Sequence, residues 1–73
     1  MSKYGHLWIY IDLIFKRTNK EKIELYFNQI KDATGFEIDH SFLIYKKELL
    51  DYGYKVEKIK FKDKIIIFSK YRY

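Results

Sequence analysis

Few side chains in this sequence could do acid–base or nucleophilic chemistry. Asp39-His40-Ser41 contains the residue types of a hydrolytic triad. Contiguous residues, however, cannot point at one another as a nucleophile, a base and an orienting carboxylate must. A metal site would need His6, His40 and a carboxylate, whose spacing matches no metal-binding pattern. With no cysteine and only three scattered glycines, a thiolate site and a glycine-rich phosphate loop are excluded. We therefore expect no enzyme, no metal and no cofactor.

Cationic side chains are concentrated at the end of the chain. Residues 54–73 hold seven of the 15 Lys and Arg but only two of the 10 Asp and Glu, so this segment carries the whole net charge of +5. Lys and Arg side chains that contact phosphates release counterions and supply most of the non-specific affinity for nucleic acid. Lysines on an exposed strand also prevent edge-to-edge aggregation, so a simple solvated face is the alternative interpretation.

The basic segment is predicted to be a β-hairpin, with strands at residues 55–61 and 65–68 joined by a polar turn at 62–64. If Ile59 and Phe61 face the core, the lysines between them share the opposite face. The residues predicted to face inward on the last strand are Ile65, Ile67 and Tyr71. Those predicted to face outward with Lys58, Lys60 and Lys62 are Ile66, Phe68, Lys70 and Arg72.

Two helices are predicted before the hairpin. Thr18 to Glu21 has the pattern of a capping box, and Gly35 closes the helix as a left-handed cap. Its apolar stripe at helical spacing is Ile23, Tyr26, Phe27, Ile30, Ala33 and Thr34. Asp39 or Ser41 caps the next helix, which Gly53 ends. The stripe of that helix is Phe42, Tyr45, Leu49 and Tyr52.

Residues 4–17 fit two structures. Their β-branched and aromatic side chains favour a strand, with Leu7, Ile9 and Ile11 on one face and Trp8 and Tyr10 on the other. The spacing of Leu7, Ile11, Ile14 and Phe15 also fits a helix. We favour the strand, which gives an α+β domain of order β-α-α-β-β: two helices packed on a C-terminal hairpin, with an N-terminal strand.

The totals bound the molecule to a single domain over residues 1–73. A chain of this length buries only about 60% of its unfolded surface, yet the sequence holds one Trp, eight Tyr and six Phe. Because so many rings are hard to bury in one small chain, we expect a homodimer. The short apolar run at residues 7–15 contains Asp12 and has no cleavage site, which favours neither a signal peptide nor a membrane span. We expect a cytoplasmic protein, of viral or plasmid type.

Residues 20–70 resemble the core of a winged helix-turn-helix DNA-binding domain. The resemblance lies in a supporting helix around Ile23 to Ile30, a turn at Ala33-Thr34-Gly35, a second helix opening at residues 39–43 and closing at residues 48–54, and a basic hairpin as the wing. In that family the second helix enters the major groove and the wing touches the backbone or minor groove. The resemblance implies groove-facing positions at His40, Ser41, Ile44 and Lys47. It implies wing contacts at Lys58, Lys60, Lys62 and Lys64.

Two other functions compete with duplex binding. If residues 6–15 pair with the hairpin, one sheet face would carry Trp8, Tyr10 and Phe68 among cations, including Lys70 and Arg72. That face is either a stacking platform for single-stranded nucleic acid or a dimer seam. A protein-interaction or inhibitor module would use the same aromatic-rich composition. The first hypothesis is a non-enzymatic regulator of transcription or replication that acts by occupying DNA.

Overall fold

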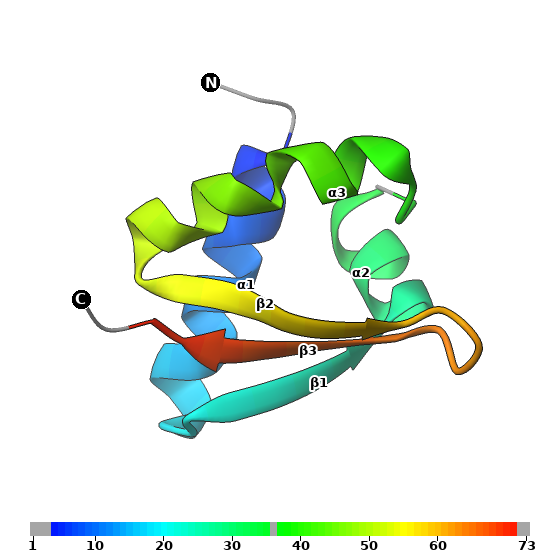
Figure 1. The fold of residues 1–73 in the computed structure, drawn as a ribbon. Helices are drawn as coiled ribbons and strands as arrows, with labels where there is room; N and C mark the ends of the chain where they lie inside the picture. Colours follow the sequence, from blue (N-terminus) through cyan, green and yellow to red (C-terminus); the bar gives the residue numbers. More distant parts are fainter. Residues whose placement is uncertain (1–3, 36, 72–73) are drawn as a thin grey trace.

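The computed structural model describes residues 4–35 and 37–71, which form an α+β domain with an antiparallel sheet (Figure 1). The helices are α1 (Gly5–Thr18), α2 (Phe27–Thr34) and α3 (His40–Tyr45), and a 3-10 helix, η1 (Lys46–Tyr52), continues α3. The strands are β1 (Lys22–Tyr26), β2 (Tyr54–Lys60) and β3 (Ile65–Lys70). The predicted α+β class is confirmed, whereas the predicted order of the first elements is not.

The sheet has the strand order β1-β3-β2, so the last strand lies in the middle. Both ladders are antiparallel, and the hairpin of β2 and β3 is as predicted. The helices lie against one face of the sheet (Figure 1). Antiparallel sheets tolerate one face packed and one face solvated, and this sheet takes that form.

The prediction of a strand over residues 4–17 is wrong, because this segment is the helix α1. Tyr4, Leu7, Trp8, Ile11 and Phe15 are buried, a spacing that only a helix places on one face. Ile9 and Leu13, which strand alternation would place on the same face as Leu7 and Ile11, are 50% and 54% exposed. Thr18 belongs to the last turn, where its hydroxyl donates to the Ile14 carbonyl at 2.8 Å. Thr18 therefore does not cap a second helix.

The predicted helix from residue 18 to Gly35 is correct only in its second half. Residues 22–26 form β1, in which Ile23 pairs with Phe68 and Leu25 pairs with Ile66. A strand buries Ile23 and Leu25 together, whereas a helix would turn Leu25 away from the face that holds Ile23. Burial of both side chains against β3 thus favours the strand.

The ends of the helical segments follow local chemistry. Gly35 and Gly53 have φ angles of 80° and 90°, and each ends its helix in the left-handed conformation that glycine adopts most easily. Asp39 caps α3, because its Oδ1 accepts from the backbone N–H groups of Ser41 and Phe42 at 2.9 and 3.3 Å. These three predicted boundaries are confirmed.

The predicted facing of β3 is wrong by one residue. Ile66 and Phe68 are fully buried, and Ile65 and Ile67 lie opposite Lys60 and Lys58 on the other face. The run Ile65-Ile66-Ile67-Phe68 is apolar on both faces, so its pattern does not determine the phase. The phase of β3 is decided by its pairing with β1 and by the register shift in β2, which falls between Val56 and Lys58.

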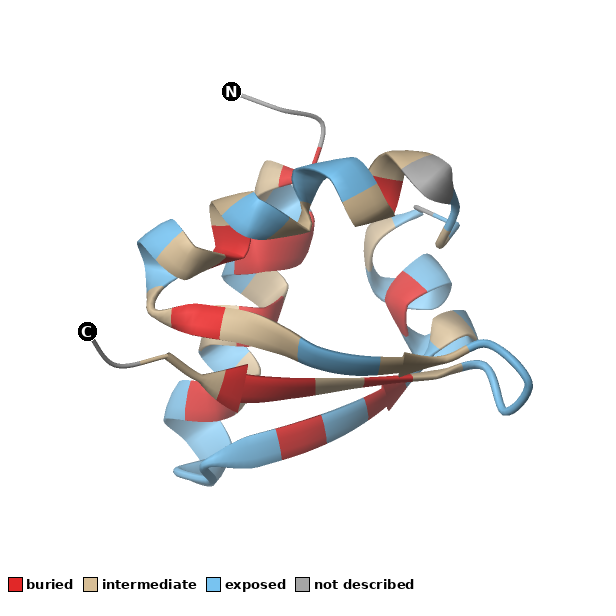
Figure 2. Cartoon of the chain, viewed as in Figure 1, coloured by how far each residue is buried: buried red, intermediate tan, exposed pale blue. Residues whose placement is uncertain are grey.

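The core lies between α1 and the inner face of the sheet, and the hairpin turn is exposed (Figure 2). Two polar contacts fasten α1 to later elements. Trp8 Nε1 donates to Glu48 of η1 at 3.0 Å, and the Tyr54 hydroxyl donates to Asp12 at 2.5 Å. Their donors are therefore satisfied without breaking the apolar packing.

Candidate nucleic-acid interface

The predicted aromatic face does not exist. Trp8 and Phe68 are 1% and 0% exposed and belong to the core of a single chain. Tyr10 is half-buried on α1 and packs against the same core. These rings point inward because α1 is a helix and because β3 has the opposite phase to the predicted one. Trp8, Tyr10 and Phe68 therefore form neither a stacking platform nor a dimer seam.

The residues whose types could form a catalytic triad or a metal site have structural roles or lie apart from one another among the described residues. Asp39 is occupied as the cap of α3 and as acceptor of the Tyr4 hydroxyl at 3.4 Å. His6 is exposed on α1, and the His40 side chain lies outside the described part of the structure. Over residues 4–35 and 37–71, no three His, Cys, Asp or Glu side chains gather as metal ligands would.

The outer side of α3 and η1 carries the predicted groove-facing positions that the structure describes. Ile44 is 67% exposed, Lys47 is exposed and Ser41 is half-buried. Phe42 and Leu49, on the opposite side, are fully buried. The segment thus has an inner side that belongs to the core and an outer side available to a partner.

The hairpin presents its lysines in three places. Lys58 and Lys60 lie on the uncovered face of the sheet, because they pair with Ile67 and Ile65. Lys62 and Lys64 are exposed in the turn. Lys70 is half-buried at the end of β3, where it pairs with buried Tyr54 and has the same phase as Ile66 and Phe68, so, contrary to the prediction, it does not share the face of Lys58 and Lys60. Arg72 lies outside the described residues. None of these five lysines forms an ion pair within the described part of the chain.

The turn of the hairpin is fixed to α2. The Phe27 N–H donates to the Lys64 carbonyl at 2.8 Å, and the rings of Phe27 and Phe61 meet edge to face with centroids 6.1 Å apart. Lys64 also lines a hollow of about 230 Å³ with Phe27 and Lys31 of α2. The tip of the hairpin therefore lies beside α2, and Lys47 lines a second hollow with Lys55 near the start of the hairpin.

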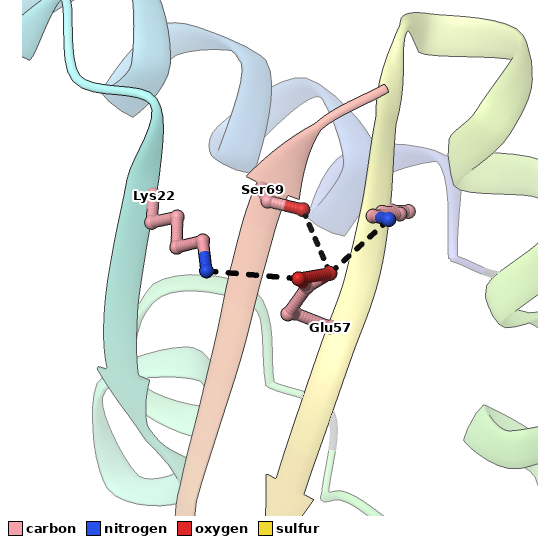
Figure 3. A network of polar contacts seen from close by, with 4 residues as sticks. Lys22, Glu57 and Ser69 are labelled. Atoms are coloured by element: carbon pink, nitrogen blue, oxygen red, sulfur yellow. Dashed lines mark hydrogen bonds and ion pairs between the residues drawn. The ribbon is translucent and has the colours of Figure 1, made fainter. Parts of the chain in front are cut away.

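A network of charged side chains crosses the uncovered face of the sheet (Figure 3). This network was not predicted from the sequence. Glu57 accepts from Ser69 Oγ at 3.2 Å and pairs with Lys55 at 3.3 Å and with Lys22 at 3.7 Å. The pKa of Glu57 is lowered, first by its bond to Lys55 and then by Ser69. Antiparallel register brings these residues together from three strands. No local pattern in the sequence could have revealed it.

No family model, no curated protein and no solved structure matches this chain. Among the helices of the described residues, none is long and apolar enough to cross a membrane. The candidate site therefore stands on its own geometry: an exposed helical side, a basic hairpin and a charged sheet face.

Proposed function

We propose that this chain is a winged-helix-like domain that binds duplex DNA and regulates transcription or replication by occupancy. The supporting features are a leading helix α1, a supporting helix α2 that ends at Gly35, a capped helix α3 and a basic hairpin. The outer side of α3 and η1 would enter the major groove, and the hairpin would act as the wing. Such an activity needs no catalytic group, and we propose that it takes place in the cytoplasm.

The distribution of unpaired cations carries this proposal. On α1 and α2, Lys16 pairs with Asp12 at 3.0 Å and Lys31 with Glu37 at 2.7 Å, whereas Arg17 at the end of α1 forms no ion pair among the described residues. In η1 and the hairpin, the lysines at positions 47, 58, 60, 62 and 64 are all without acidic partners among the described residues. A surface with an excess of positive charge attracts a polyanion and orients the protein on it.

The first experiment is a binding titration of the purified protein against random duplex DNA and single-stranded oligonucleotides at low and at physiological salt. We expect duplex binding whose affinity falls steeply as salt rises, because binding releases counterions from the phosphates. Absence of binding at low salt would overturn the proposed function. A preference for single strands would move the site away from α3.

A protein-interaction module remains the second candidate, because several large rings are exposed. Tyr26, Tyr45, Tyr52 and Phe61 are between 41% and 57% exposed, and interfaces are enriched in tyrosine. Salt separates the two candidates. An aromatic interface keeps its affinity at high ionic strength, whereas phosphate-driven binding does not.

A further inference from the structure

A small basic groove lies between η1 and the start of β2. It has a volume of about 130 Å³ and is lined by Lys46, Lys47, Leu50, Lys55 and Val56. Three of these five residues are lysines, and none carries a carboxylate. The groove is larger than a single water molecule, which occupies about 30 Å³ in the liquid.

The fold brings the lysines together across Gly53. The left-handed conformation of Gly53 reverses the chain after η1. The Tyr71 N–H donates a hydrogen bond to the Gly53 carbonyl at 2.9 Å. Side chains three residues apart eclipse one another in a 3-10 helix, so Lys47 and Leu50 share one side of η1. Half-buried Leu50 and Val56 contribute apolar walls, along which lysine stems can lie while their ammonium groups stay in water.

The charge around the groove is only partly compensated. Within the described residues, Lys46 and Lys47 form no ion pair. Lys55 has a carboxylate only in Glu57, which it shares with Lys22. Like charges that share a small site repel one another, and an anion between them relieves the repulsion. Lysine binds phosphate oxygens as a compact point charge.

We propose that this groove binds a phosphate of the nucleic-acid backbone, held by Lys46 and Lys47 from η1 and by Lys55 from β2. The inference rests on the proposed function and adds the phosphate contact that links the helix to the wing. Lys46 and Lys55 are the residues it adds. The contact positions the protein on the backbone and carries no sequence information, while Ser41 and Ile44 remain available for base edges.

The test compares two variants that each lose two positive charges. Lys46→Gln/Lys55→Gln alters the groove, and Lys16→Gln/Lys20→Gln alters exposed lysines at the end of α1 and in the following loop. Duplex affinity is measured over a series of salt concentrations, after thermal melting has shown that both variants are folded. The slope of log affinity against log salt should fall by about 0.9 in the groove variant, the value for one lost phosphate contact. The control should keep the wild-type slope.

The outcomes separate this inference from the proposed function. If the groove variant behaves like the control while the wild type binds duplex DNA, the phosphate site is wrong and the proposed function stands. If the wild type does not bind DNA, both are wrong. Titration of inorganic phosphate, followed by NMR at Leu50 and Val56, distinguishes the source of the anion. Binding of free phosphate without duplex binding would contradict a backbone ligand.

Glu57 provides a second test of the same groove. Glu57→Gln removes the carboxylate that competes with a phosphate for Lys55. We therefore expect the single variant to bind duplex DNA about two- to fivefold more tightly than the wild type, the equivalent of one exposed ion pair. In the Lys46→Gln/Lys55→Gln background the same substitution should have little effect. An equal gain in both backgrounds would show that Glu57 acts through overall charge and would contradict a role for Lys55.

Discussion

At the scale of single residues, Tyr54 joins the hairpin to α1. Its hydroxyl donates to Asp12 at 2.5 Å, and its ring stacks on Phe15 with centroids 4.4 Å apart. Burial, and then the bond to Asp12, raise the pKa of Tyr54 to about 12. The same bond, with a further contribution from Lys16, lowers the pKa of Asp12. The neutral phenol and the charged carboxylate are thus the forms that the fold stabilises.

Tyr54→Phe should remove the hydrogen bond while keeping the stacked ring. We expect a loss of about 1 to 2 kcal/mol at pH 7, measured by urea unfolding, because the bond has a charged acceptor. A raised pKa gives stability that is complete below the ordinary tyrosine pKa near 10 and is lost as the pH rises toward 12. The difference between wild type and variant should therefore shrink over that range.

The acid side of the same pair gives an independent readout. Because the pKa of Asp12 is lowered in the fold, its contribution is present above the ordinary aspartate pKa and is lost as the pH falls below it. In Tyr54→Phe, NMR titration should show the pKa of Asp12 move upward. Tyr52→Phe, at an exposed tyrosine, should change neither quantity. An unchanged pKa of Asp12 in Tyr54→Phe would contradict the hydrogen bond between Tyr54 and Asp12.

At the scale of elements, α3 and η1 divide into a core side and a partner side. Leu49 is fully buried and Ile44 is 67% exposed. Leu49→Ala should cost about 2 to 5 kcal/mol, because it leaves a cavity, and Ile44→Ala should leave stability within about 0.5 kcal/mol. Chemical denaturation measures both. Ile44→Ala should instead weaken DNA binding, and a variant that binds normally would remove α3 from the interface.

The hairpin is the element expected to supply most phosphate contacts. Lys58, Lys60 and Lys62 changed together to Gln should weaken binding to all duplex sequences and lower the salt slope by about 2 to 3, because each lysine neutralises up to one phosphate. A matched triple variant at Lys16, Arg17 and Lys20 loses the same charge at the end of α1 and in the following loop, and it should keep the slope. Equal effects in the two variants would mean that overall charge, and not the hairpin, drives binding.

At the scale of the whole molecule, one chain buries more aromatic surface than its size led us to expect. The buried rings are those of Tyr4, Trp8, Phe15, Phe42, Tyr54 and Phe68. Among the described residues, three large aliphatic side chains stay exposed: Ile9 and Leu13 of α1 and Ile44 of α3. Ile9 and Leu13 are four residues apart and therefore lie on one face of α1. We propose this face of α1 as the seam of the predicted homodimer, because it lies away from the helical side and the hairpin proposed to bind DNA.

Light scattering tests the homodimer. We expect a mass of about twice the 9.1 kDa chain. Ile9→Gln/Leu13→Gln should reduce it to that of a monomer that stays folded, since both side chains lie outside the core of the single chain. A monomeric wild type would show that the dimer prediction is wrong. A double variant that stays dimeric would place the seam away from α1.

Local features of the sequence determined the parts of this protein that depend on neighbouring residues. These are the hairpin, the ends of helices at Gly35 and Gly53, the Asp39 cap and the concentration of charge after residue 53. Each follows from backbone geometry or side-chain chemistry within a few positions. The outward positions of Ile44 and Lys47 were likewise predictable, because they oppose Phe42 and Leu49 across one short helical segment.

The tertiary structure alone decided which faces are buried. Residues 22–26 form a strand because β3 offers a free edge, and β3 has its phase because β1 and β2 pack on it, all through contacts between residues far apart in sequence. The burial of Trp8 also depends on a residue distant in sequence, because Glu48, 40 positions away, accepts a hydrogen bond from its indole N–H. The Glu57 network and the groove of Lys46 and Lys55 could likewise not be predicted from the sequence, because their residues come together only in the folded chain. Strand pairing and burial depend on distant partners, which periodicity within one segment does not contain.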